Sequence, residues 1–221
     1  MIDYTNDNQK RENVIQFIRI TQKLIEEEGI KNVSIRKIAV LSGFHSSALY
    51  FYFKDLNELI MLASIMHFQT YSAEFEKQIH TADPYDKFFA IWKCFAESAF
   101  QCPCVFLNFF FGKDSDNLLP FLNTYYDLFP EEKNQHSDAI SSIYFGKNYS
   151  ERCMKLLLPL IHDEHTRVTY DNIVVLNEIT LSFSKELIAQ KCQNPELNSH
   201  ELRQKMLNML HLLVDRSTNS K

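Results

Sequence analysis

Apolar residues recur at intervals of three and four along most of the chain, and this spacing is typical of amphipathic helices. Stretches that alternate apolar and polar residues between turn pairs, as half-buried strands do, are absent from the sequence. The six prolines all lie beyond residue 83, where they separate successive helical stretches. The sequence therefore predicts an all-α fold.

The same periodicity predicts where the helices lie. A first helix over Lys10–Glu28 ends at Gly29, and a short second helix over Ile35–Leu41 has Ser34 as its N-cap. A third short helix follows over 46–53, and a fourth begins near Asp55 and continues toward residue 79. The later helices are expected over 85–101, 103–111, 118–128, 137–144, 150–161, 166–192 and 199–216.

Glycine is scarce, and its placement excludes a class of enzymes. The four glycines, Gly29, Gly43, Gly112 and Gly146, lie far apart. Phosphate-binding loops need clustered glycines, because backbone must approach the phosphate closely. Nucleotide-dependent enzymes of the common folds are therefore excluded. No nucleophile stands at a recognisable spacing from a base, so we expect no enzyme and no cofactor.

The sequence also predicts the compartment. It begins with polar and acidic residues rather than a signal peptide, and its longest apolar stretches fall short of the ~20 residues of a membrane span. We therefore expect a cytoplasmic protein without membrane contact. Five cysteines, an odd number, then favour reduced thiols. The pair Cys102 and Cys104 has no second cysteine pair near it to complete a metal site, which favours plain structural thiols near a helix break.

One polar cluster allows a metal site. His162 and His165 flank two acidic residues, and this spacing would place both imidazoles within one turn. The cluster stands where one helix ends and the next begins, which favours a solvated loop. We therefore expect no metal.

Residues 34–53 have the pattern of a helix-turn-helix. Ile38 and Leu49 are expected to point inward, and Ala39 is small where the next helix crosses. Gly43 permits a left-handed backbone in the turn, and the Phe44 side chain is expected to pack into the core and anchor the turn. The helix that follows the turn would then be free to enter a DNA major groove.

The local charge agrees with this interpretation. Between Gly29 and Lys54 there are four basic residues and no acidic ones, whereas the whole chain has a net charge of −5. Four positive charges alone would indicate only a solvated face. Together with the turn pattern they predict contact with DNA phosphates.

Residues 11–60 resemble the DNA-binding region of the TetR family of transcriptional regulators. The stretch SIRKIAVLSGFHSSALYFYFKDLNELI, residues 34–60, carries the similarity. The matching positions are Ile38, Ala39, Gly43, Leu49, Tyr50, Tyr52, Phe53 and Leu59. The resemblance implies a three-helix DNA-binding domain over 1–54 and a larger helical ligand-binding and dimerisation domain over 55–221.

The resemblance also implies which side chains meet DNA. Tyr50 and Tyr52 would contact the DNA backbone, and the front of the third helix would reach the bases. The full set of candidate DNA-binding residues is Ser34, Arg36, Lys37, His45, Ser46, Ser47, Tyr50, Phe51, Tyr52 and Lys54. Leu56 departs from the family pattern, which often has a phosphate-binding lysine there, so Lys54 is the expected substitute.

Aromatic residues gather between Tyr85 and Phe129, which hold 14 of the chain's aromatic side chains. Most of them are expected to form a core, but sensor domains of the resembled family commonly enclose an apolar ligand pocket. The candidate ligand-binding residues are Trp92, Phe95, Phe106, Asn108 and Phe110. Asn108, if buried, needs a partner, which could be a ligand or a neighbouring carbonyl group.

The last two predicted helices carry more apolar residues than one buried stripe needs. This surplus predicts a homodimer through them, unless the helices are buried on all sides within one chain. The leading hypothesis is a repressor that a small apolar or aromatic ligand releases from its double-stranded DNA operator. The alternatives are a ligand-independent DNA-binding structural or cell-division protein on the same fold, and a helical enzyme.

Overall fold

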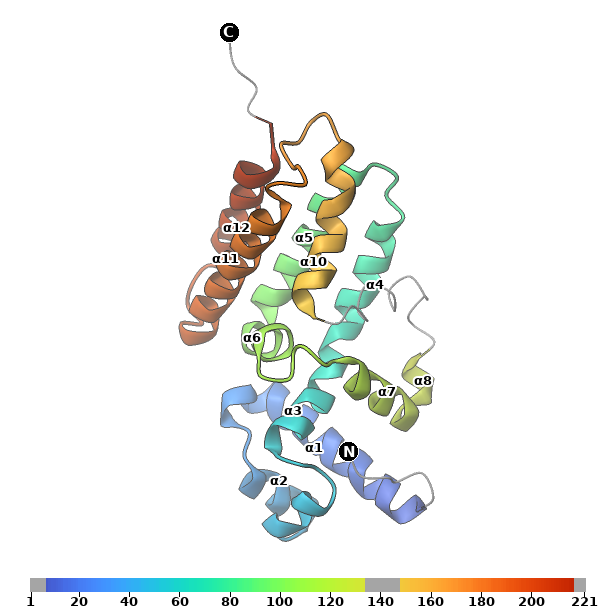
Figure 1. Ribbon diagram of the computed structural model, residues 1–221. Coiled ribbons are helices and arrows are strands. Elements are labelled where there is room, and N and C mark those ends of the chain that lie inside the picture. The colour runs from blue at the N-terminus through green and yellow to red at the C-terminus, as the bar shows by residue number, and fades with distance from the viewer. Residues whose placement is uncertain (1–6, 134–147, 217–221) are drawn as a thin grey trace. The chain divides into compact units, whose positions relative to one another are not determined.

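The computed structural model describes residues 7–133 and 148–216 (Figure 1). Every regular element in these two ranges is a helix, apart from one isolated bridge between Thr166 and Asp215, so the all-α prediction is confirmed. The described residues form two compact units. One comprises 7–69 and 119–133, and the other comprises 70–118 and 148–216.

The first unit holds the N-terminal helices and one later segment. Its elements are α1 (Asn8–Glu28), η1 (Ile30–Asn32), α2 (Ile35–Ser42), η2 (Ser46–Phe51), α3 (Leu56–Ser64), η3 (Ile65–His67), α7 (Leu119–Leu128) and α8 (Pro130–Lys133). The helix that was expected from Asp55 toward residue 79 consists of α3, the single 3₁₀ turn η3 and α4 (Phe68–Ile79) in direct succession. Asp55 caps α3 by accepting a hydrogen bond from the Glu58 amide at 2.9 Å.

Contacts between α1 and α7 extend the first unit beyond residues 1–54. The Arg11 guanidinium donates to the backbone carbonyl of Asp127 at 2.6 Å. The Gln22 amide donates to the Tyr125 hydroxyl at 3.2 Å, and that hydroxyl donates to Glu132 at 2.7 Å. The segment 119–133 therefore packs with the N-terminal helices. We predicted that residues 1–54 alone form the DNA-binding domain, and this functional assignment stays a prediction.

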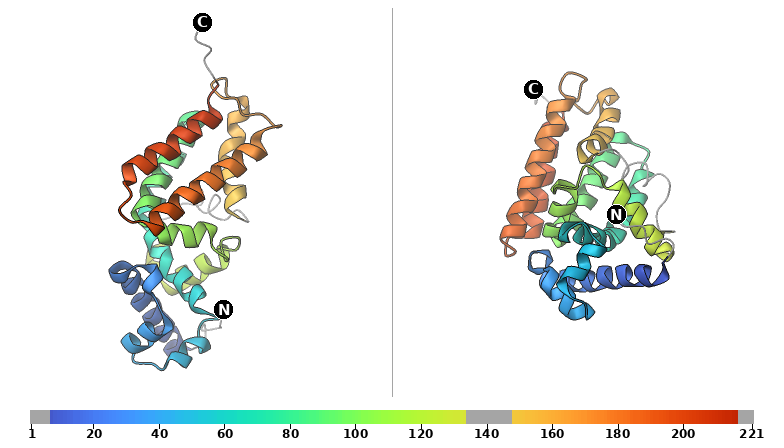
Figure 2. Two further views of the ribbon diagram at one scale, coloured as in Figure 1. Left: turned by 90° about the vertical axis from the view of Figure 1, so that its left-hand side faces the viewer. Right: turned by 60° about the horizontal axis from the view of Figure 1, so that its bottom comes forward.

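The second unit is a helical bundle. Besides most of α4 it contains α5 (Pro84–Gln101), α6 (Pro103–Phe111), α10 (Tyr149–Leu157), η4 (Leu158–His162), α11 (Ile173–Gln193) and α12 (Ser199–Val214). α11 packs against α6, α10 and α12, and α12 also packs against α5. Figure 2 shows α11 and α12 side by side, joined by a short connection.

The start of the predicted helix over 166–192 is wrong, because α11 begins only at Ile173. The Thr166 hydroxyl donates to the Leu160 carbonyl at 2.6 Å, and the Arg167 amide donates to the Val214 carbonyl at 2.9 Å. These bonds hold the segment extended beside the end of α12. The predicted helix over 150–161 is also divided, since Pro159 stands where α10 gives way to η4. The predicted helix over 137–144 lies outside the described residues.

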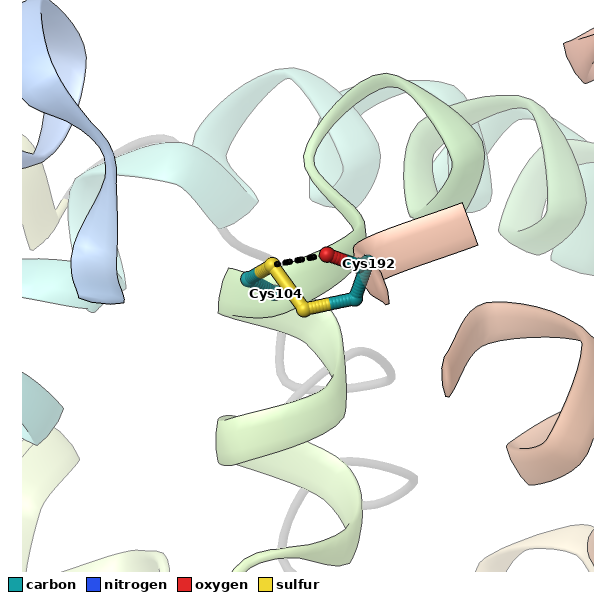
Figure 3. The surroundings of a disulfide bond; sticks show 2 residues. All are labelled: Cys104 and Cys192. Atoms are coloured by element: carbon teal, nitrogen blue, oxygen red, sulfur yellow. Dashed lines mark hydrogen bonds between the residues drawn. A yellow bond between two sulfur atoms is a disulfide. The ribbon is translucent and has the colours of Figure 1, made fainter. Parts of the chain in front are cut away.

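The expectation of reduced thiols is wrong for two of the five cysteines. Cys104 at the start of α6 and Cys192 near the end of α11 form a disulfide, with their Cα atoms 5.0 Å apart (Figure 3). The two residues are 88 positions apart in the sequence, and only the packing of α6 on α11 brings them together. Cys94, Cys102 and Cys153 are free thiols.

Within the described ranges, no single helix is long and apolar enough to cross a membrane. The pair α5 and α6, bent by 118°, reaches that length and apolar composition only when the two helices are taken together.

The disulfide can be tested by counting thiols. Thiol titration of the denatured protein should find three reactive groups without reductant and five after reduction. Because the bond closes a long loop, its reduction should lower the free energy of unfolding by ~2–4 kcal/mol. Finding five thiols in protein prepared without reductant would contradict the disulfide.

Candidate DNA-binding surface and ligand pocket

The turn between α2 and η2 has the backbone that its sequence predicted. The Ser34 hydroxyl caps α2 by accepting a hydrogen bond from the Lys37 amide at 3.3 Å. Gly43 has φ +76° and ψ 14°, a left-handed conformation that glycine adopts at little cost. The Phe44 amide donates to the Ala39 carbonyl at 3.1 Å, which closes the turn. Ser34 therefore fixes where α2 begins, and Gly43 fixes where it ends.

One side of η2 is anchored in the core of the first unit. Leu49 and Phe53 are buried, and the fully buried Phe17 ring lies 6.0 Å from the ring of Phe53 and 5.1 Å from that of Phe44. Tyr52 is half-buried, with its ring 5.4 Å from Phe17, and its hydroxyl accepts a hydrogen bond from the Asn13 amide at 2.9 Å. These contacts give η2 a fixed orientation.

The opposite side of η2 is exposed, and it carries several of the candidate DNA-binding residues. Phe51 is 73% exposed and Tyr50 is 58% exposed. Ser46 and Ser47 are exposed beside them, and His45, the N-terminal flanking residue of η2, is exposed too. Sequence reasoning did not name Val40 and Leu41 of α2, two further exposed apolar residues of this unit.

The basic candidate residues differ in their exposure and in the contacts they make. Arg36 and Lys54 are exposed, and the Lys54 amide donates to the Glu58 carboxylate at 2.5 Å. Lys37 forms an ion pair with Glu28, at the end of α1, and donates to the Asn32 carbonyl at 3.0 Å. Glu28 precedes Gly29, so the count of charged residues between Gly29 and Lys54 did not include this acidic partner of Lys37.

Leu56, which stands where a lysine was expected, has a structural explanation. Its side chain is half-buried, and it lines a small depression together with Ile35, Leu49 and Leu59. Leu56 therefore lies where α2, η2 and α3 pack against one another. The neighbouring Lys54 is exposed, and its role as the substitute for this lysine stays a prediction.

The second unit contains a partly open apolar pocket. The pocket is lined by Tyr71, Phe75, Ile91, Trp92, Phe95, Phe110, Tyr149, Arg152, Cys153 and Leu156. Three of the five predicted ligand-binding residues, Trp92, Phe95 and Phe110, are in this lining.

The other two predicted residues lie outside the lining. Phe106 is buried with its ring 5.7 Å from Phe95 and 5.6 Å from Phe110, so it supports the wall from behind. Asn108 is half-buried, and its backbone carbonyl accepts a hydrogen bond from the Gly112 amide at 3.0 Å. Neither side chain faces the empty space of the pocket.

Sequence reasoning missed the contribution of α10. Tyr149, Arg152, Cys153 and Leu156 line the pocket from one face of this helix, at spacings of three and four. The periodicity was visible, but it did not show which face met the aromatic wall. Burial raises the pKa of Cys153 to about 12 and that of Tyr149 well above its usual value, so both side chains stay protonated at neutral pH.

The surfaces of α11 and α12 combine buried and exposed apolar residues. Val174, Val175 and Ile179 of α11 are exposed, as is Leu212 of α12. Leu210, one of the residues in the predicted surplus, is fully buried within its own chain. The apolar surplus is therefore divided between the core of the unit and an uncovered surface.

The polar cluster at 162–165 makes no metal site in the described structure. No group of three or more histidine, cysteine or acidic side chains in the described ranges is arranged to hold a metal ion. The Asp163 carboxylate instead accepts a hydrogen bond from the His165 amide at 2.8 Å.

No sequence model of a protein family matches the chain, and no curated protein matches it. Solved structures do match. The repressor FadR of Thermus thermophilus, a TetR-family protein in complex with lauroyl-CoA, has a TM-score of 0.56 at 12% identity, over 96% of this chain and 98% of that one.

Two further structures agree. The ketosteroid transcriptional regulator KstR2 of Mycobacterium tuberculosis has a TM-score of 0.54 at 13% identity, over 98% of this chain and all of that one. A TetR transcriptional regulator from Rhodococcus sp. RHA1 has a TM-score of 0.52 at 13% identity, with the same coverage. The helix-turn-helix and the helical bundle together therefore give this chain the fold of the TetR-family transcriptional regulators.

Proposed function

We propose that this protein is a DNA-binding transcriptional regulator of the TetR family. It acts in the cytoplasm as a homodimeric repressor, which a small apolar or aromatic ligand releases from its operator. One observation carries the proposal: η2 presents exposed aromatic and small polar side chains on one side, while buried residues hold its other side in place.

The exposed face of η2 suits a DNA groove. Phe51 is 73% exposed, and its aromatic edge can pack against thymine methyl groups. Ser46 and Ser47 are short enough to let the backbone approach base edges. Four basic residues and no acidic one lie between Gly29 and Lys54, and Arg36 and Lys54 are exposed, so this segment favours contact with phosphates even though Lys37 is paired with Glu28.

We assign two roles to the candidate DNA-binding residues. Phosphate contacts position a protein on DNA, whereas contacts to base edges carry sequence information. The positioning residues are Ser34, Arg36, Lys37, Tyr50, Tyr52 and Lys54, and the reading residues are His45, Ser46, Ser47 and Phe51. Lys37 should contribute less than Lys54, because it is already paired with Glu28.

The pocket of the second unit supports a ligand-responsive role over the ligand-independent alternative. We propose that Trp92, Phe95 and Phe110 contact the ligand, because they line the pocket. FadR, which shares the fold, is a repressor whose solved structure contains lauroyl-CoA. The raised pKa of Cys153 argues against a nucleophilic role for that thiol, because it is not a thiolate at neutral pH.

The uncovered apolar surface of α11 and α12 supports a two-fold dimer. Val174, Val175 and Ile179 would meet their counterparts in a second copy, so the same patch is buried on both subunits. The two copies of η2 in the dimer would then contact successive major grooves ~34–36 Å apart. A ligand releases DNA if it favours a conformation in which this separation no longer matches.

DNase footprinting of the purified protein on the DNA upstream of its own gene tests the function. A protected site with two-fold symmetry, lost on adding an apolar or aromatic compound, is the expected result. Protection of all sequences alike, with no response to any ligand, would favour the structural DNA-binding protein instead.

The division between positioning and reading residues predicts opposite behaviour for two variants. Lys54→Ala should weaken binding to operator and random DNA alike, and should reduce the salt slope by about 0.9, the release of one counterion. Ser47→Ala should change operator preference by roughly 1–3 kcal/mol per affected base pair, with random-sequence affinity retained. Affinities measured across a salt series, with melting temperatures alongside, check both.

Lys93→Ala is the matched control, since Lys93 is an exposed lysine of the second unit. It should leave both affinities unchanged. A sequence-selective effect of Lys54→Ala, together with a uniform effect of Ser47→Ala, would reverse the two assignments.

The dimer interface predicts the effect of a charge on α11. Val175 is 53% exposed, so Val175→Arg should leave the subunit folded and convert dimers to monomers, because two buried arginines would repel each other across the axis. Sedimentation velocity measures this. Leu158→Arg, at an exposed position of η4, is the control and should remain dimeric. An unchanged dimer in Val175→Arg would place the interface elsewhere.

A further inference from the structure

The ligand pocket has a positively charged wall. Among the ten described residues that line it, Arg152 of α10 is the one charged residue, and none of these ten has a carboxylate. The Arg152 side chain is deeply buried, since the residue is only 4% exposed. A guanidinium keeps its charge at every physiological pH, so the apolar pocket contains a permanent cation on its wall.

Aromatic rings hold this cation in place. The guanidinium carbon of Arg152 lies 5.5 Å from the ring centre of Tyr149 and 5.7 Å from that of Phe110. Both distances are within the range of cation–π attraction. Both rings belong to the pocket lining as well, so the cation and the apolar wall form one surface.

A second hydrogen-bond donor lies in the same lining. The indole Nε1 of Trp92 is buried and makes no hydrogen bond with the part of the chain that the structure describes. An indole N–H can only donate, and a buried donor gains free energy from an acceptor that enters the pocket. Trp92 and Arg152 therefore both favour a ligand group rich in acceptors.

Tyr149 and Cys153, which also line the pocket, carry no negative charge that would repel an anionic ligand. Tyr149 and Cys153 interact by a side-chain hydrogen bond and both stay protonated, since burial raises their pKa values. The rest of the wall is mainly aromatic and aliphatic, which suits a ring or a short hydrocarbon chain. The pocket thus combines an apolar body with one cationic end.

We propose that the effector is a small aromatic carboxylate, whose carboxylate group binds Arg152 and Trp92 while its ring lies among Phe75, Phe95 and Phe110. A carboxylate fits the two parallel donors of one guanidinium, and its single negative charge matches the single cation among the described lining residues. This inference deepens the proposed function by naming the class of the ligand. Only the expected release of DNA on binding rests on the proposed function.

Direct binding tests the inference without DNA. Trp92 is the chain's only tryptophan, so its fluorescence reports on the pocket. Benzoate, phenylacetate and 3-phenylpropionate are each titrated against the corresponding primary amide, which has nearly the same shape and no charge. At least one acid should bind, about tenfold or more tightly than its amide. Equal or tighter binding of the amides, or no binding of any acid, would overturn the inference.

Two arginine variants locate the charge. Arg152→Gln should abolish the preference for acid over amide, whereas Arg203→Gln should keep it, because Arg203 pairs with Glu97 outside the pocket. Arg152→Lys, which retains the charge but loses the fork of donors, should keep a reduced preference. If Arg152→Gln does not fold, as judged by its melting curve, Arg152→Lys decides. A preference that is unchanged in the variants of Arg152 would overturn the assignment.

Trp92→Phe tests the second donor by calorimetry, since it keeps an aromatic ring and removes the N–H. Acid affinity should fall several-fold while amide affinity changes less. The footprint separates the two proposals: acids that bind through Arg152 without releasing DNA would contradict the proposed function and leave the ligand class standing.

Discussion

The aromatic cluster around Phe17 is the interaction on which the candidate DNA-binding surface depends. η2 is a 3₁₀ helix of six residues, too short to be stable by itself. Phe17 is fully buried and contacts the rings of Phe44, Tyr52 and Phe53, which flank η2 on both sides. The orientation of the exposed serines and aromatic residues thus follows from the packing of a side chain on α1.

In the candidate ligand site of the second unit, one helix changes the character of the wall. The aromatic residues of α5 and α6 provide an apolar wall that would accept many compounds. In our proposal Arg152 of α10 restricts these compounds, because a buried cation favours a ligand that brings a negative charge. The aromatic residues would then provide affinity, and the arginine would provide selectivity.

Interactions between segments far apart in sequence account for the corrections. The disulfide depends on the packing of α6 against α11, and no spacing rule relates Cys104 to Cys192. The segment before α11 is extended because the Arg167 amide donates to the Val214 carbonyl at the end of α12, 47 positions later. In each case a distant partner prevailed over local periodicity.

The amino-acid sequence by itself determined the helical fold, the turn at Gly43 and the cap at Ser34, because apolar spacing, left-handed backbone and capping are local properties. It also named three of the ring side chains that line the pocket. Only the tertiary structure decided that α10 completes the pocket, that Phe106 and Asn108 stay outside it, and that Lys37 pairs with Glu28. Those outcomes depend on which faces of the helices meet, and a one-dimensional pattern does not contain that information.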